Sequence, residues 1–247
     1  MQPIRDNKAY VPAVMTRWIA CRIVSHADLG AKERGYKIFQ SLSHQSSLRS
    51  SAGWFFELYT HNWLRKGGRF VADLLSRKDS EEELSFYIDP AHNKEARFFT
   101  TSADLANQLK KQGGRGVDNM QIRVYFQPRC RNQEFFDGLM VKTQDMLILF
   151  QITMASTHEI KVGGVRDILQ ELPKTIKTVC DVFTIPADRA DNYKKPQKAP
   201  VSEDLTINNH EYTIKQYRLV FPDDDVLSIA VPRQPRAVSK GKRKRRE

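Results

Sequence analysis

Cysteine is scarce in this sequence of 247 residues: it occurs three times, at wide spacing and never as a CxxC pair. Three isolated thiols do not suggest a disulfide framework or a zinc cage, and they favour a reducing compartment. No apolar run approaches the roughly 20 residues of a membrane-spanning helix, and Pro12, Arg17 and Arg22 break the apolar stretch near the amino terminus. We therefore expect a soluble protein with no signal peptide and no membrane partner.

Two signatures of common hydrolases are also missing. No GxxxxGK[ST] loop occurs, which excludes a nucleotide-hydrolysing P-loop module. No serine elbow of the GxSxG kind occurs either, which argues against acyl-transfer hydrolases.

Acidic residues are in deficit, with 29 Asp and Glu against 40 Lys and Arg and a net charge of +11. This balance favours anionic partners, and nucleic acid before membrane, because no stretch has the apolar face of a lipid-surface helix. The carboxy-terminal segment KGKRKRRE carries the cations Lys240, Lys242, Arg243, Lys244, Arg245 and Arg246. Such a run is a nuclear-localisation signal bound by an import receptor, or else a flexible nucleic-acid-binding or solubilising tail. We expect a nuclear protein.

Composition divides the chain into four parts. Residues 1–50 form a lead-in with one helix, 13–24, and a linker, 41–51; residues 51–186 form an α/β domain with a central mixed sheet flanked by helices. Residues 187–232 form a linker and a C-terminal hairpin, and residues 233–247 a disordered basic tail. Helices are predicted over 52–66, 102–111 and 165–172. Strands are predicted over 69–75, 84–89, 97–100, 121–127, 135–141, 146–155, 179–185, 212–221 and 226–231.

Glu57 is the first polar anomaly, since it lies in the centre of the apolar helical segment WFFELYTHNWL. A buried carboxylate is costly unless it is paired or bound to a metal. One turn further along the helix, His61 is its nearest ring partner. Glu57 is therefore a candidate metal ligand, and the alternative is an ion pair with His61 or with an arginine at the helix edge.

The segments FFDGLMV and LILFQITMA contain the second anomaly, because Asp137 and Gln151 are polar among apolar neighbours. A hairpin loop of residues 143–145 would pair Lys142 with Met146 and set Asp137 directly opposite Gln151. Together with Glu57, these side chains would offer a magnesium-type site two carboxylates and an amide oxygen, with open positions for water and phosphate. The alternatives are a strand-end acid for Asp137 and a core amide for Gln151.

Three segments of the chain resemble, in order and spacing, the restriction-endonuclease-like carboxy-terminal domain of Crinkler (CRN) effectors and the related retrotransposon-hot-spot proteins. The segments are GWFFELYTHNWLRKGGRF, VYFQP with RNQEFFDGLM, and LFQITMASTHEIKVGGV. The resemblance extends from about Gly53 to Pro186 and implies a PD-(D/E)xK nuclease core. It implies that Glu57 is the helix acid, Asp137 the metal-binding aspartate and Gln151 the occupant of the second strand-acid position. His158 matches the histidine that follows the glutamine strand.

The chain departs from active nucleases of this fold at one place. They carry an acid, any residue and a lysine on the second strand, where this chain has Gln151, Ile152 and Thr153. A neutral amide lowers the charge that holds Mg²⁺ or Mn²⁺, and Thr153 cannot replace the lysine that stabilises the transition state. His158, Lys161 and Lys142 are the candidates to assist.

Loop arginines and lysines near strand ends are the candidates for phosphate contacts, the alternative being scattered solvated charges. They are Arg65, Lys66, Arg69, Arg115, Arg129 and Arg131. The sequence thus predicts a nuclear effector-like protein that binds nucleic acid, DNA in preference to RNA, with a site for phosphodiester hydrolysis by a divalent metal. The competing hypothesis is a catalytically inactive nuclease-fold module that acts by binding nuclear protein or DNA.

Overall fold

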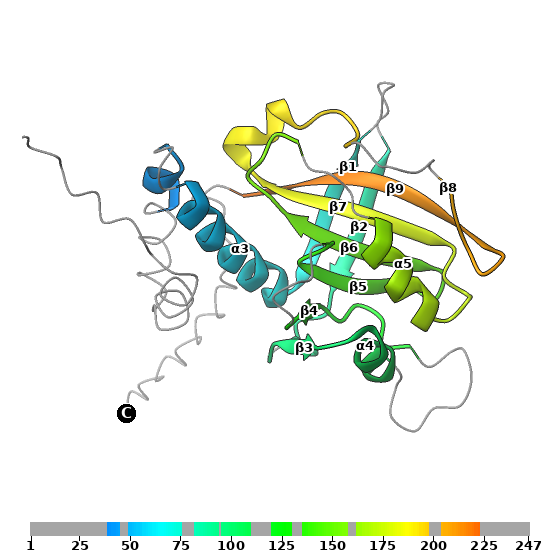
Figure 1. The fold of residues 1–247 in the computed structure, drawn as a ribbon. Coiled ribbons are helices and arrows are strands. Elements are labelled where there is room, and N and C mark those ends of the chain that lie inside the picture. The colour runs from blue at the N-terminus through cyan, green and yellow to red at the C-terminus, as the bar shows by residue number, and fades with distance from the viewer. Residues whose placement is uncertain are drawn as a thin grey trace, which may run out of the picture.

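The structure, a computed structural model, describes residues 39–44, 49–75, 82–93, 95–109, 120–129, 135–157, 162–197 and 204–222 (Figure 1). The helices are α3 (Arg49–Lys66), α4 (Ser102–Leu109), α5 (Val162–Glu171) and the 3-10 helix η3 (Ala187–Asn192). The strands are β1 (Gly68–Leu74), β2 (Glu83–Ile88), β3 (Arg97–Phe99), β4 (Phe126–Pro128), β5 (Gly138–Thr143), β6 (Met146–Ile152), β7 (Thr178–Pro186), β8 (Asp204–Ile207) and β9 (His210–Phe221).

Within these residues nine strands form one sheet in the order β2-β1-β9-β7-β6-β5-β4-β3, with β8 paired to β9. The three central strands, β6, β7 and β9, are parallel to one another. β1 and β5 flank them in antiparallel orientation. The predicted fold class, a mixed sheet with helices, is confirmed.

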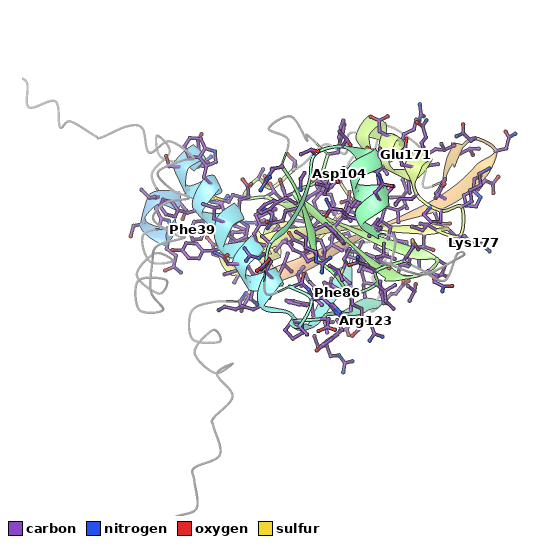
Figure 2. The ribbon with its side chains drawn as sticks, turned by 90° about the horizontal axis from the view of Figure 1, so that it is seen from below. Phe39, Phe86, Asp104, Arg123, Glu171 and Lys177 are labelled. Atoms are coloured by element: carbon purple, nitrogen blue, oxygen red, sulfur yellow. The ribbon has the colours of Figure 1, made fainter. Side chains whose placement is uncertain are left out.

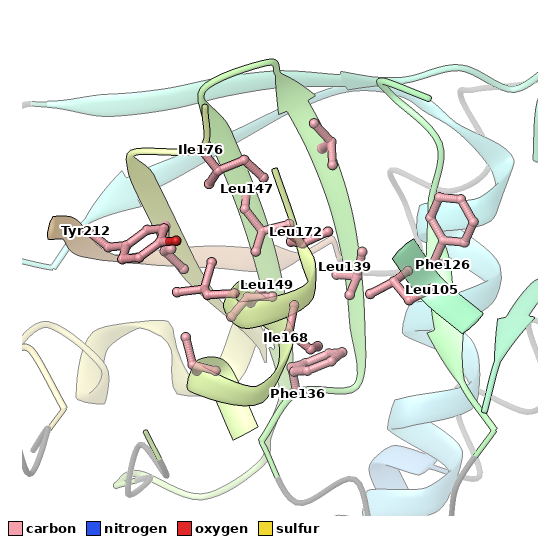
Figure 3. Close-up of a cluster of buried hydrophobic side chains, with 14 of the residues drawn as sticks. Leu105, Phe126, Phe136, Leu139, Leu147, Leu149, Ile168, Leu172, Ile176 and Tyr212 are labelled. Atoms are coloured by element: carbon pink, nitrogen blue, oxygen red, sulfur yellow. The ribbon is translucent and has the colours of Figure 1, made fainter. Parts of the chain in front are cut away.

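One face of the sheet is covered by α4 and α5. Figure 3 shows Ile168 of α5 and Leu172, just after this helix, over Leu147 and Leu149 of β6, in the largest apolar cluster of the described structure. The predicted helix 165–172 owes its position to this apolar stripe.

The opposite face of the central strands is covered by β1 and β2 of the same sheet. Phe70 of β1 and Phe86 of β2 belong to one cluster with Phe150 of β6. The ring centroids of Phe86 and Phe150 lie 5.7 Å apart. Because β1, β9 and β7 separate β2 from β6 in the strand order, this contact requires the sheet to curl.

Helix α3 crosses the ends of the central strands (Figure 1). Its buried Phe55 and Phe56 share a cluster with Met154, just after β6, and with Phe221 at the end of β9. The helix stops at Gly67, as predicted, where φ is +71° and an added Cβ would lie 2.7 Å from the Ile88 oxygen. Glycine is required there. α3 thus lies at the carboxyl ends of β6 and β9, the usual place for ligand sites in such sheets.

Several boundaries differ from the predictions. Residues 39–43 are helical and α3 begins at Arg49, so the predicted linker 41–51 is in part helix. The predicted strand 121–127 is interrupted at Arg123, whose φ is +63°, and Pro128 is within β4 rather than after it. Thr101, not Ser102, caps α4, because its Oγ1 accepts a hydrogen bond from the Asp104 amide at 3.0 Å.

The carboxy-terminal strand differs most in its pairing. The sequence predicts a hairpin of 212–221 with 226–231, and the second of these segments lies outside the described residues. In the structure the hairpin partner of β9 is β8. β9 also pairs with β7 and β1, so it is an inner strand of the sheet rather than an extension to the domain. The helix predicted at 13–24 lies outside the described residues. None of the helices in the described part of the chain has the length and apolar character to cross a membrane.

Candidate active site

The β5–β6 hairpin has the register predicted from its sequence over most of its length. Gly138 pairs with Phe150 and Leu139 with Leu149, as predicted. The described pairing begins at Gly138, so Asp137 lies just before the ladder and is not paired with Gln151 in it. The pairing shifts only at the loop, where Thr143, not Lys142, is opposite Met146.

Asp137 is tied to the end of β6 by two hydrogen bonds. Its amide donates to the Phe150 oxygen at 2.7 Å, and its Oδ2 accepts from the Ile152 amide at 2.6 Å. Asp137 therefore contacts the backbone on both sides of Gln151. These bonds hold the Asp137 carboxylate at the end of β6, beneath α3.

Glu57 faces the same region from α3 through a chain of side chains. Its Oε1 lies 3.7 Å from Nε2 of His61, and the two side chains are 19% and 11% exposed. His61 Nδ1 and the buried Tyr125 hydroxyl share a hydrogen bond of 2.8 Å, whose direction depends on the imidazole tautomer. The predicted pairing of Glu57 with His61 is confirmed, and it continues to a tyrosine.

The Tyr125 hydroxyl is the point on which both predicted carboxylates act. Burial raises the pKa of Tyr125 well above its ordinary value, and the negative charges of Asp137 and Glu57 raise it further. A hydrogen bond with Gln127 and the positive charge of Arg65 lower it. The positions of the residues agree with this: the Tyr125 hydroxyl is hydrogen-bonded to His61, the partner of Glu57, and lies against Gly138, the neighbour of Asp137.

Gly138 makes room for this arrangement. A Cβ at position 138 would lie 2.2 Å from the Tyr125 hydroxyl oxygen. The absence of a side chain next to Asp137 is therefore what allows the phenol to reach between the two acids.

Arg65 continues the polar stripe of α3, since positions 57, 61 and 65 are each one helical turn apart. It is half-buried, and its Nε is buried without a hydrogen-bond partner in the described structure. The helix thus presents an acid, an imidazole and a guanidinium in succession toward Tyr125.

Gln151 has a different partner. Its Nε2 donates to Oδ2 of Asp181 at 3.2 Å, and the two residues are 3% and 2% exposed. Burial raises the pKa of Asp181 to about 8, so this carboxyl is mainly protonated at neutral pH. Gln151 is a core amide here, bonded to a side chain rather than to backbone. Among the described contacts, the side chain of Gln151 bonds to Asp181. Glu57 and Asp137 instead both raise the pKa of Tyr125.

Of the residues expected to assist in place of the missing lysine, the structure describes Lys142 alone. Thr153 is buried and its Oγ1 accepts a hydrogen bond from the Ala155 amide at 3.1 Å. Lys142 is five residues along β5 from Asp137, about 17 Å at ~3.3 Å per residue, so its prediction as a catalytic assistant is wrong. His158 and Lys161 lie outside the described residues.

The described members of the predicted phosphate-binding set are Arg65, Lys66, Arg69 and Arg129. Arg65 is half-buried, whereas the other three are exposed. The Arg129 guanidinium lies over the ring of Phe98, 5.0 Å from its centroid. Arg115, Arg131 and the six cations of the basic tail lie outside the described residues.

The carboxylates of Glu57 and Asp137 are the possible metal ligands of this site. Within the described residues no group of three or more His, Cys, Asp or Glu side chains is arranged to hold a metal ion. Mg²⁺ keeps several waters and needs only one or two carboxylates besides substrate phosphates. Glu57 and Asp137 fit that minimum, and they do not fit a zinc cage.

Sequence reasoning missed Tyr125, Gln127 and Asp181. The segment VYFQP has the composition of an ordinary apolar strand, so nothing in it distinguished Tyr125 from a core aromatic. Asp181 did carry a signal, because it is an acid inside the apolar run VCDVF, the same anomaly that identified Glu57 and Asp137.

Comparison of the chain with protein-family models, with curated proteins and with solved structures gave no significant match.

Proposed function

We propose that this chain binds nucleic acid, DNA in preference to RNA, and hydrolyses its phosphodiester bonds at the site of Glu57 and Asp137. The proposal rests on one arrangement: the buried Tyr125 hydroxyl is hydrogen-bonded to His61, the partner of Glu57 on α3, and lies against Gly138, the residue next to Asp137. A helix acid over the carboxyl ends of parallel strands, with a second acid on the adjoining hairpin, also supports a restriction-endonuclease-like core for this sheet.

In this proposal Glu57 and Asp137 would hold Mg²⁺ or Mn²⁺, which supplies Lewis-acid polarisation of the phosphate and a water-derived nucleophile. Tyr125 fixes the imidazole of His61, and His61 fixes Glu57 from the other side. Arg65 supplies positive charge for the transition state. It takes the role of the lysine that Thr153 cannot fill.

Cleavage of plasmid DNA and of RNA, with Mg²⁺ and with Mn²⁺, tests the proposal. Glu57→Gln and Asp137→Asn remove one charge each, and the asparagine keeps an acceptor for the Ile152 amide. We expect the unmodified protein to cleave and each variant to be roughly 100-fold slower. Asp104→Asn, in the first turn of α4, is the control. Absence of cleavage with both metals, or equal rates in both variants, would refute the nuclease.

A second function, nucleic-acid or nuclear-protein binding without cleavage, is favoured by Thr153, which is buried and engaged where a lysine is expected. It predicts that the protein binds DNA in the same assay, that no product forms, and that Asp137→Asn leaves binding unchanged.

We also propose that residues 233–247 direct the protein to the nucleus through an import receptor, on the density of cations in KGKRKRRE. Fusion of these residues to a fluorescent protein should concentrate it in nuclei. A cytoplasmic distribution would refute the signal.

A further inference from the structure

A second polar site lies at the end of β5 opposite to Asp137. A cavity of about 230 Å³ opens there between the β1–β2 hairpin and the last residues of β5. The polar residues that line it are Arg69, Ser85, Tyr87, Arg123, Lys142 and Thr143. The volume is below the ~300 Å³ at which pockets begin to enclose drug-sized ligands, which suits a small group. Figure 2 shows Arg123 next to Phe86, which also lines the cavity.

The lining carries three cations and no carboxylate. Arg69 Nε donates to the neutral Ser85 hydroxyl at 3.2 Å. Within the described residues, the ion pairs use other cations, namely His61, His92, Lys194, Lys215 and Arg218. The positive charge of the cavity is therefore not neutralised by these pairs.

The neighbouring carboxylates are already engaged. Asp89 accepts from the Ala91 amide at 2.8 Å and lies 2.9 Å from His92 Nδ1. The hydrogen bond from Ala91 is the main reason that its pKa is lowered, and the charge of Arg123 contributes. Asp145 accepts from the Thr143 hydroxyl at 2.6 Å.

Arg123 is held in a conformation that its residue type disfavours. Its φ is +63°, in the left-handed region that L-residues other than glycine rarely adopt. Its amide donates to the Val141 oxygen at 2.8 Å and its oxygen accepts from the Asp89 amide at 2.9 Å. These two bonds fix Arg123 between β5 and the end of β2, with its side chain exposed in the cavity. Strain retained at a polar, exposed residue is typical of functional positions.

We infer that this cavity binds a phosphoryl group. Two guanidinium groups, an ammonium group and hydroxyl donors are the set that recognises phosphate oxygens. If the proposed function holds, the ligand is a backbone phosphate of the bound nucleic acid, and Tyr87, 42% exposed at the rim, offers a surface for base stacking. The cavity and the carboxylates are about 17 Å apart along β5 at ~3.3 Å per residue, so this phosphate is a different one from that of the scissile bond.

The test compares Arg123→Gly with Lys142→Gln and their double variant. Glycine removes the charge of Arg123 and tolerates its positive φ, so loss of binding cannot be ascribed to backbone strain. Arg166→Gln is the charge-matched control, because Arg166 is exposed on α5, which covers the opposite face. Binding of a 12-nucleotide single strand is measured by fluorescence anisotropy in EDTA at several salt concentrations, and inorganic phosphate is titrated in parallel.

We expect the double variant to bind the strand about tenfold more weakly, as loss of a charge-assisted contact implies. Its log–log salt slope should fall by about 0.7 per lost phosphate contact. A change in phosphate binding alone would assign the cavity to free phosphate instead of a nucleic-acid backbone. Strand affinity, salt slope and phosphate binding all equal to those of Arg166→Gln would overturn the inference. Because EDTA removes the metal, failure here is distinguishable from failure of cleavage.

Discussion

At the scale of single residues, the most unusual environment is that of Asp181. Its Oδ1 and the Oε1 of Gln151 are both buried without a hydrogen-bond partner in the described structure. A proton on Asp181 gives Gln151 Oε1 a donor, while Gln151 Nε2 already donates to the other carboxyl oxygen. The protonated acid and the amide then satisfy one another, which is the arrangement that a buried polar pair needs.

Asp181 should therefore make the stability of the protein depend on pH. Its pKa is about 8 in the folded state and about 3.9 in an unfolded chain. Between these values the folded state holds the extra proton, so the free energy of unfolding falls as pH rises, by at most about 1.4 kcal/mol per pH unit. Asp181→Asn keeps an acceptor for Gln151 and adds a donor. Urea unfolding at pH 5 and pH 8 should show a smaller pH difference in this variant and greater stability at pH 8.

Asp104→Asn is the control for that measurement. Hydrogen bonding by Gln108 and Thr100 lowers the pKa of Asp104, so this half-buried acid is ionised throughout the range from pH 5 to pH 8. Its removal should leave the difference unchanged. An Asp181→Asn variant with the pH dependence of the unmodified protein would contradict the assignment.

Gly138 is the residue on which the site depends sterically. Gly138→Ala places a Cβ 2.2 Å from the Tyr125 hydroxyl, and such overpacking costs about 1–3 kcal/mol. We expect lower stability in thermal or urea unfolding. Gly53→Ala is the matched control, since no atom lies within 4 Å of its added Cβ and alanine stabilises a helix interior by about 0.5–1 kcal/mol. Equal effects of the two substitutions would show that Tyr125 does not occupy this space.

At the scale of elements, one face of α3 packs on the strand ends and another carries the polar residues of the proposed active site. Phe55 and Phe56 anchor it over the strand ends, and positions 57, 61 and 65 turn toward Tyr125. This division makes a prediction for Arg65. If Arg65 stabilises the transition state, Arg65→Gln lowers kcat by roughly 100-fold with little change in KM, and Arg65→Lys restores part of the rate.

Lys66→Gln is the control, because Lys66 is adjacent but exposed. Steady-state cleavage kinetics distinguish the two roles of Arg65. A rise in KM at constant kcat would make it a nucleic-acid contact alone, as its sequence position beside Gly67 first indicated.

Elements set by local patterns were predictable, and those set by distant contacts were not. Gly67 fixed the end of α3, whereas the helix begins at Arg49, three residues before the predicted start. Alternation fixed the hairpin register at Gly138 and Phe150. The break at Arg123 was not predictable, because arginine rarely adopts positive φ and its bonds come from Val141 and Asp89. The pairing of Gln151 with Asp181 likewise depends on the parallel alignment of β6 and β7, which no local pattern specifies.

At the scale of the whole molecule, the sheet is completed by its last described strand. β9 pairs with β7 from Thr178 to Pro186 and with β1 at Asp73 and Leu74. β9 thereby joins the β1–β2 hairpin to β7, β6 and β5, the last of which follows Asp137. The curl of the sheet that covers the cluster of Phe70, Phe86 and Phe150 depends on this connection.

The position of β9 predicts where the chain can be shortened. A protein ending at residue 203 loses β8 and β9, which leaves the edges of β7 and β1 unpaired and separates the two halves of the sheet. We expect it to be unfolded or aggregated by circular dichroism and gel filtration. A protein ending at residue 222 keeps every strand of the sheet, and we expect it to unfold cooperatively like the full chain. If the shorter protein were to fold as well as the longer one, the domain would be complete at residue 186 and β9 would not be needed to position the active site.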